Sequence, residues 1–261
     1  MAAAGALPIV LIPGIQGHWE WMKPTLDALR PTRDVRTFSL NVEDGTQDPF
    51  DRWMAEVDRA IDATGAARAV IVGVSFGGLV AVRYAATRPD RTAAVILASS
   101  PSPRMALGQA EQQLLKRPLL LLPLFAIRGL RRLLPEVLAA HDTWLDRLRF
   151  LVTYGWQVTR RPIAPRQTAR WVRTWQTRSR ELAADCARVC APVRLITGDT
   201  HLDRVVPVSS TRDYLTLIPG STAVVLPRTG HIGLVSKPAA FAALVNEFIN
   251  GLDDSRSRRS A

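Results

Sequence analysis

The sequence has few cysteines, few lysines and no long hydrophobic run. Its two cysteines, Cys186 and Cys190, are too few for a disulfide framework, and their C-x-x-x-C spacing fits neither a redox motif nor a zinc site. No apolar run approaches the roughly 20 residues of a membrane-spanning helix. The opening residues, MAAAGALPIVLIPG, lack the basic segment of a signal peptide. We therefore expect a soluble, cytoplasmic protein.

Positive charge is carried by arginine and is concentrated in one part of the chain. The formal net charge is +11, and residues 101–190 hold 15 Arg and one Lys against six acidic residues. Such an excess can favour nucleic acid, an anionic membrane surface or anionic substrates. No nucleic-acid-binding motif accompanies it, so we expect no nucleic-acid partner and interpret most of these arginines as solvated helix faces.

Strand and helix patterns alternate at both ends of the chain. Runs of β-branched and other apolar residues predict strands at 8–12, 34–40, 68–74, 93–99, 193–197 and 222–226. Helical spacing of apolar residues predicts helices at 21–30, 51–64, 76–87, 206–217 and 238–252. Buried strands joined by helices predict an α/β fold, with a mostly parallel sheet of about six strands flanked by helices.

The pattern changes between the fourth and fifth predicted strands. Residues 101–190 contain no convincing strand and predict three to five helices, which we interpret as a cap inserted into a core formed by 1–100 and 191–252. Residues 253–261 are expected to be a disordered tail. Four tryptophans of the cap offer apolar surface to a substrate, although ordinary packing between cap helices explains any single one of them better than ligand contact does: Trp144, Trp156, Trp171 and Trp175.

One stretch combines a buried strand with a glycine-rich turn. Residues 69–78 read AVIVGVSFGG, and the spacing around Ser75 is G-x-S-x-G. Between a strand and a helix this pattern is typical of a nucleophile elbow, in which a strained turn exposes the serine hydroxyl at the edge of the sheet. Ser75 is therefore the candidate nucleophile.

A serine hydroxyl needs a base, and the base needs an acid that fixes its tautomer. His231 follows the last predicted strand in TGH, and Asp203 follows the strand before it in GDTHLDRVVP. Asp199, in the same loop, is the alternative acid. Two backbone N–H groups are the candidate oxyanion donors, those of Ile15 in LIPGIQG and of Phe76.

These motifs together resemble the α/β-hydrolase superfamily over about residues 8–100 and 190–250. GVSFGG is similar to the family's elbow, TGHIGLV to its histidine loop, and GDTHLDRVVP to its acid loop, where Asp203 stands four residues before a proline. In LIPGIQGHWEWM a proline replaces the family's usual histidine before Gly14, and His18 is a candidate substitute. The short segment before residue 8 leaves no room for the family's first hairpin, so a trimmed sheet of six strands is expected.

The resemblance implies a serine hydrolase that cleaves carboxylic esters through an acyl-enzyme intermediate, without metal or cofactor. The expected substrate is a small apolar ester. A C–C bond hydrolase, a lactonase or an acyltransferase with the same triad remains an alternative, as does a catalytically silent ligand-binding protein. The oligomeric state is left open.

A peripheral membrane protein is a further alternative. Residues 119–127, followed by Arg128, Arg131 and Arg132, could lie in a lipid interface. Against this we expect the prolines at 118, 123 and 135 to interrupt any long amphipathic helix.

Overall fold

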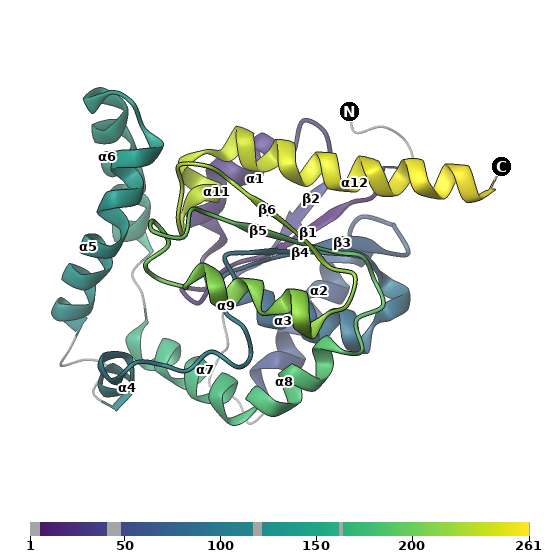
Figure 1. Cartoon of the computed structure of the whole chain (residues 1–261), viewed down its shortest axis with the longest axis horizontal. Coiled ribbons are helices and arrows are strands. Elements are labelled where there is room, and N and C mark those ends of the chain that lie inside the picture. The colour runs from purple at the N-terminus through teal and green to yellow at the C-terminus, as the bar shows by residue number, and fades with distance from the viewer. Residues whose placement is uncertain (1–5, 41–47, 117–121, 162–163, 261) are drawn as a thin grey trace.

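The chain folds around one sheet of six parallel strands in the part that the structure describes (Figure 1). The computed structural model describes residues 6–40, 48–116, 122–161 and 164–260. The strands lie in the order β2-β1-β3-β4-β5-β6, and every neighbouring pair is parallel. They are β1 (Ile9–Ile12), β2 (Val35–Thr37), β3 (Ala69–Val74), β4 (Thr92–Ala98), β5 (Val193–Thr197) and β6 (Thr222–Val225). The predicted α/β fold is confirmed.

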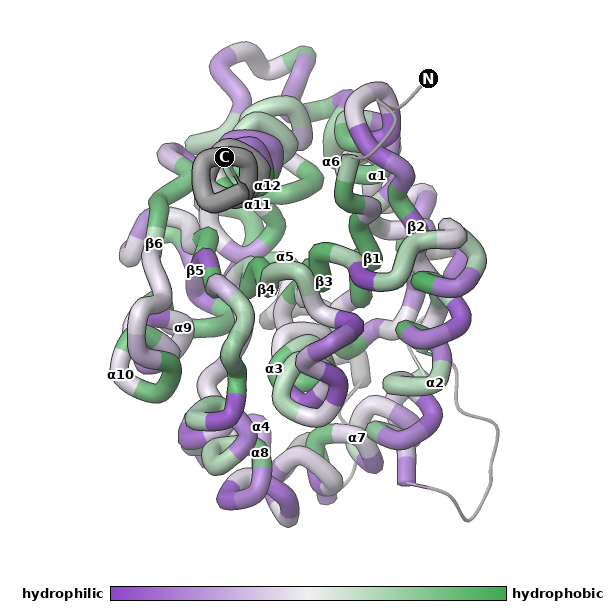
Figure 2. Tube along the Cα trace, turned by 90° about the vertical axis from the view of Figure 1, so that its right-hand side faces the viewer, coloured by the Kyte–Doolittle hydropathy of each residue, from purple (hydrophilic) through white to green (hydrophobic). Residues whose placement is uncertain are grey.

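Helices cover both faces of the sheet because its strands are apolar on both sides. In β1, Val10 and Ile12 pack into one core cluster, while Ile9 and Leu11 pack into the other. The first face carries α2 (Pro49–Asp62), α3 (Gly77–Thr87) and the short helices α9 (Val208–Arg212) and α10 (Tyr214–Leu217); the second carries α1 (Lys23–Leu29), α11 (Gly233–Ser236) and α12 (Pro238–Ser260). Figure 2 shows hydrophobic residues along the central strands and hydrophilic ones along the outer helices.

The described part of 101–190 contains helices joined by short loops and no strand, but these helices do not form one separate layer. The helices are α4 (Gln109–Lys116), α5 (Leu122–Ala140), α6 (Trp144–Arg160), α7 (Pro165–Thr177) and α8 (Ser179–Cys186). Apolar side chains of α7 and α8 join the core cluster under α3, whereas α5 and α6 stand together at the outer side of the molecule (Figure 1). The cap over 101–190 stays a prediction, and within that range the apolar stripe of α7 packs into the core.

Two expectations about helix ends were wrong. Residues 253–260 continue α12 instead of forming a disordered tail; the sequence has no proline or glycine after Gly251, and its acidic residues precede arginines at helical spacing. Pro135 does not interrupt α5, which runs through it from Leu122 to Ala140. Pro123 lies in the first turn of that helix, where no backbone N–H is needed. Pro118 and residues 119–121 lie outside the described residues.

Trp171 on α7 is a structural side chain rather than a surface of the cap. Its ring meets Trp53 edge to face at 5.2 Å and stacks on Phe76 at 6.5 Å, and it is 2% exposed. Trp171→Ala is therefore expected to lower the free energy of unfolding by about 3–5 kcal/mol, measured by urea denaturation. The exposed Trp156 is the matched control, and Trp156→Ala should change stability by less than about 0.5 kcal/mol. Equal losses in the two variants would contradict the assignment of Trp171 to the core.

Candidate active site

Ser75 occupies the turn between β3 and α3 in a strained conformation. Its φ is 50°, in the left-handed region, which costs a non-glycine residue about 1–2 kcal/mol. The Ser75 N–H donates to the carbonyl of Ala98 at 2.8 Å, which holds the turn against β4. A Cβ at Gly73 would lie 2.6 Å from the carbonyl oxygen of Gly77, and a Cβ at Gly77 would lie 2.5 Å from that of Pro13. Glycine at both positions lets strand, helix and neighbouring loop close around the serine.

The loop after β1 reaches the same serine. A Cβ at Gly14 would lie 3.4 Å from the Cβ of Ser75, and the Gly17 N–H closes a turn by donating to the Gly14 carbonyl at 2.9 Å. The two expected oxyanion donors therefore belong to backbone that adjoins Ser75: Ile15 follows Gly14, and Phe76 begins the turn into α3. This is the side on which the peptide dipoles of α3 favour a negative charge.

The acid loop after β5 brings Asp203 to His231. The side chain of Asp203 is 1% exposed, and its Oδ2 lies 3.4 Å from Nδ1 of His231. Its Oδ1 accepts from the backbone N–H groups of Val205 and Val206 at 3.2 and 2.9 Å, which fixes the carboxylate. The two loops touch through their backbones, since a Cβ at Gly230 would lie 2.6 Å from the carbonyl oxygen of Leu202.

Asp199 lies in the same loop but serves another partner. Its Oδ2 accepts from the backbone N–H of Arg228 at 2.8 Å, and its own N–H donates to the carbonyl of Thr229 at 2.8 Å. The structure thus brings Asp203, and not Asp199, into contact with His231.

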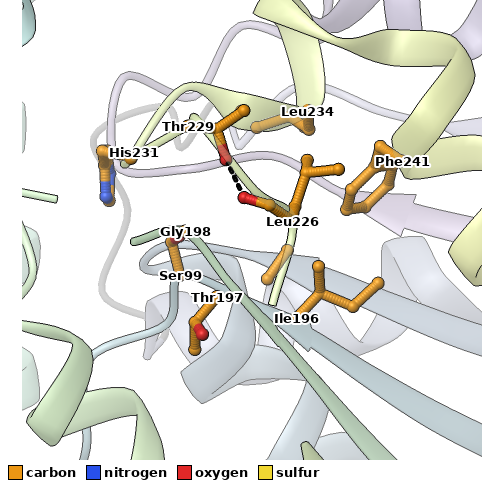
Figure 3. A pocket seen from close by; sticks show the side chains of 12 residues that line it. Ser99, Ile196, Thr197, Gly198, Leu226, Thr229, His231, Leu234 and Phe241 are labelled. Carbon is orange, nitrogen blue, oxygen red and sulfur yellow. Dashed lines mark hydrogen bonds between the residues drawn. The ribbon is translucent and has the colours of Figure 1, made fainter. Parts of the chain in front are cut away.

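The histidine loop rests on a closely packed base (Figure 3). Thr229 donates its hydroxyl to the Leu226 carbonyl at 2.7 Å, the dashed bond in the figure. Behind the loop lies a cavity of only about 10 Å³, bordered by Ser99, Leu234 and Phe241, which is at most the room for one water molecule. Little space remains for His231 to withdraw in that direction.

Two opposing effects act on the pKa of His231. Burial lowers it, but the Asp203 carboxylate raises it through charge and through the hydrogen bond, and Glu136 adds to that effect. The net pKa lies above the usual value for histidine. His231 can accept a proton only above this pKa, so any reaction that uses it as a base should fail as the pH falls.

Ser75 and His231 line the same small pocket, which has a volume of about 60 Å³. No direct hydrogen bond joins these two described side chains, and such bonds often form only once a substrate is bound. The wall adds polar groups from Gln16 and His18, so His18 does lie at the site. Its apolar and aromatic members are Trp21, Met22, Val74, Tyr154, Ile232, Leu234 and Val235.

None of the four tryptophans that the sequence offers as substrate contacts lines this pocket, so their contact with a substrate stays a prediction. Trp171 and Trp175 are buried in the core, and Trp144 and Trp156 are exposed on α6. The aromatic wall comes instead from Trp21 and Tyr154. Trp21 belongs to the motif LIPGIQGHWEWM, so the sequence could have indicated that it lies at the site. Nothing in the sequence singles out Tyr154.

Glu136 is a second residue at the site that sequence analysis missed. It extends from α5 and is fully buried, and both carboxylate oxygens accept from the backbone N–H of Ile232, at 3.0 and 3.1 Å. Burial raises the pKa of Glu136 to about 7, against the opposing effect of backbone hydrogen bonds from Ile232 and Gly230. This carboxyl therefore ties α5 to the residue directly after His231.

Glu136→Gln is expected to change two pH dependences. The folded-state pKa of Glu136 is raised, so folding loses stability as pH rises from about 4.5 to about 7, by roughly 3 kcal/mol at the upper end. The neutral variant escapes this loss, so its melting temperature should exceed that of the wild type more at pH 8 than at pH 5. Removing the charge should also move the acidic limb of kcat/KM to lower pH, because Glu136 raises the pKa of His231. Parallel melting curves at the two pH values would contradict a buried, titrating carboxyl.

Among the described residues, no group of three or more His, Cys, Asp or Glu side chains is arranged to hold a metal ion. No helix in the described ranges is long and apolar enough to cross a membrane.

Known proteins share this fold. The model of the alpha/beta hydrolase family matches residues 9–244. A candidate carbamate hydrolase, RutD, from Enterobacter cloacae is 24% identical over 266 residues, which cover 95% of this chain and 92% of the relative. MenH from S. aureus superposes with a TM-score of 0.71 at 19% identity and covers 97% of both chains. The enol-lactonase from Burkholderia xenovorans LB400 superposes with a TM-score of 0.67 at 19% identity, over 95% of this chain and 93% of its own.

Proposed function

The chain belongs to the alpha/beta hydrolase family, and from that premise we propose that it is a serine hydrolase that cleaves carboxylic esters through an acyl-enzyme intermediate. The observation that carries the proposal is the Asp203–His231 contact, together with the pocket that His231 lines jointly with Ser75. Ser75 is the nucleophile, His231 the general base and Asp203 the orienting acid.

In the first half-reaction the Oγ of Ser75 attacks the ester carbonyl while Nε2 of His231 takes its proton. The N–H groups of Ile15 and Phe76 hold the oxyanion that forms. The bond to the leaving oxygen then breaks, and His231 returns the proton to the departing alcohol. In the second half-reaction water attacks the acyl-serine by the same route and frees the acid and Ser75.

The pocket supports a small, apolar acyl group. Its volume of about 60 Å³ is well below the roughly 150 Å³ of an apolar cavity that accommodates benzene. About half of its lining residues are aliphatic or aromatic, and among the described residues no arginine or lysine lines it to pair with a charged substrate. A lactonase, a C–C bond hydrolase or an acyltransferase would use the same triad, and a silent binding protein would retain the pocket without turnover.

A panel of p-nitrophenyl esters tests the proposal. We expect kcat/KM to rise from acetate by about fourfold for each added methylene that fits, the equivalent of about 0.8 kcal/mol, and then to fall beyond short chains. Including a lactone and a p-nitrophenyl carbamate separates ester cleavage from lactone and carbamate cleavage. Preference for either of these over every ester would overturn the ester assignment, and no turnover of any substrate would favour the silent binding protein.

Tyr154→Ala should shift this optimum toward longer acyl chains because the ring forms part of the pocket wall. Phe150→Ala is the matched control, since Phe150 stacks on Tyr154 at 5.4 Å but does not line the pocket. The control should lose comparable ring packing and keep the wild-type optimum. An identical shift in both variants would show that α6 moves as a whole, and that Tyr154 does not set the chain length.

A further inference from the structure

Helix α6 carries an apolar stripe on its outer side. Trp144, Leu148, Val152 and Trp156 are spaced four residues apart and are between 51% and 67% exposed. Residues four apart lie on one side of a helix. Leu145 and Leu151 are also exposed and widen the stripe.

The opposite side of α6 holds the helix to the protein. Tyr154 meets Trp21 edge to face at 6.2 Å and stacks on Phe150 at 5.4 Å, and Phe150 packs against His141 at 5.0 Å. With its inner side already packed, α6 keeps its apolar stripe directed outward. Contiguous exposed apolar surface of this kind marks an interaction site.

Helix α5, which stands beside α6, carries a second row of exposed leucines. Its exposed Leu130, Leu134 and Leu138 also repeat every four residues. The Arg147 guanidinium donates to the carbonyls of Leu138 and His141 at 3.1 and 3.0 Å, so the start of α6 is fixed to the end of α5. Figure 1 shows both helices on the outer side of the molecule, away from the sheet. We define the outer cap face as Leu130, Leu134, Leu138, Trp144, Leu145, Leu148, Leu151, Val152 and Trp156.

The charges beside the outer cap face are positive. Arg131 and Arg149 are exposed on the two helices, and the Arg160 guanidinium lies 4.6 Å from the ring centroid of Trp156. The nearby acids are engaged: Asp142 pairs with Arg228, and Asp146 accepts from the hydroxyl of Thr143 at the start of α6. The three arginines outnumber Asp146, the single nearby acid that forms no ion pair among the described residues, so the apolar stripe is flanked by an excess of positive charge.

We propose that the outer cap face binds the surface of an anionic phospholipid bilayer. Leucine and tryptophan side chains on one side of a helix, with arginines at its edge, suit the boundary between headgroups and acyl chains. Anionic headgroups would neutralise Arg131, Arg149 and Arg160. A second copy of the chain fits less well, because pairing two such faces would bring these arginines together. The proposal concerns the surface alone and does not depend on ester hydrolysis.

Vesicle binding by the full chain tests it. We expect co-sedimentation with phosphatidylcholine vesicles that contain about one third phosphatidylglycerol, weak binding to pure phosphatidylcholine, and loss of binding at high salt. The exposed Trp144 and Trp156 should also shift their fluorescence to shorter wavelength on binding. Equal binding to both vesicles, or none to either, would overturn the proposal.

Matched variants separate the apolar stripe from the charge. Leu148→Asp should abolish binding, whereas Leu215→Asp, at an exposed leucine of α10, should not. Arg131→Gln with Arg149→Gln should weaken binding about 25-fold, since each arginine near an anionic surface contributes about fivefold. Arg166→Gln with Arg180→Gln removes the same charge from exposed positions of α7 and α8 and should have little effect.

Light scattering in solution tests whether a second copy of the chain, and not a bilayer, covers the outer cap face. If the face were covered by a second copy, the wild type would be a dimer that Leu148→Asp converts to a monomer, and vesicles would not be bound. That result would overturn the proposal. All variants change exposed side chains, so their melting temperatures should stay near that of the wild type.

Discussion

Ser75→Ala is expected to abolish ester hydrolysis, with kcat falling by roughly 10⁶-fold to the residual level supplied by binding and the oxyanion donors. The loss should be this large because no other described side chain of the pocket can replace the hydroxyl: Ser75 is the pocket's only serine, and no threonine or cysteine lines it. The free energy of unfolding should change little, because alanine would adopt the same left-handed backbone conformation as Ser75 at a similar cost.

A fluorophosphonate probe gives this prediction a direct readout. The wild type should be labelled once per chain and Ser75→Ala not at all. Ser99→Ala is the matched control, because Ser99 also has a positive φ, of 44°, at the end of the neighbouring strand β4. It should label like the wild type. Labelling that survives Ser75→Ala, or a wild type that the probe never labels, would falsify the assignment of Ser75 as nucleophile.

The features predicted correctly from the sequence are those encoded locally. The strand before Ser75 is a continuous β-branched run, and the glycines at 73 and 77 are required by backbone contacts that any elbow of this shape must make. The order of the candidate residues along the chain placed Asp203 and His231 after successive strands, and parallel strands bring such positions to one edge. Each inference needed only a short window and the geometry of a parallel sheet.

The features that the sequence does not reveal concern side chains whose surroundings come from distant segments. Trp171 looked like a cap residue, but its neighbours Trp53 and Phe76 lie about a hundred residues earlier. Tyr154 lines the pocket only because α6 packs beside the pocket. Glu136 reaches the histidine loop only because α5 packs beside that loop. Apolar spacing in these helices does not reveal which side faces the protein, and both sides of α6 are in fact apolar.

The sequence favours Asp203 as the acid but keeps Asp199 as an alternative, because the two residues share one loop. The structure distinguishes them by their partners: Asp203 lies 3.4 Å from Nδ1 of His231, while Asp199 accepts from the N–H of Arg228. Asp203→Asn should therefore lower kcat by about 10⁴-fold, since an amide favours the wrong tautomer of the histidine. Asp199→Asn should stay within about tenfold of the wild type, a change of roughly 1.4 kcal/mol in the barrier.

The pH profile of the two variants provides a second, independent measurement. Asp203 raises the pKa of His231 through charge and through its hydrogen bond. Asp203→Asn removes the charge, so the pKa of His231 should fall, and the acidic limb of kcat/KM should move to lower pH in whatever activity remains. Asp199→Asn should leave that limb in place, because Asp199 is not among the groups that shift His231. If Asp199→Asn instead causes both the large loss and the shift, then Asp199 is the acid, and the acid loop rearranges when substrate binds.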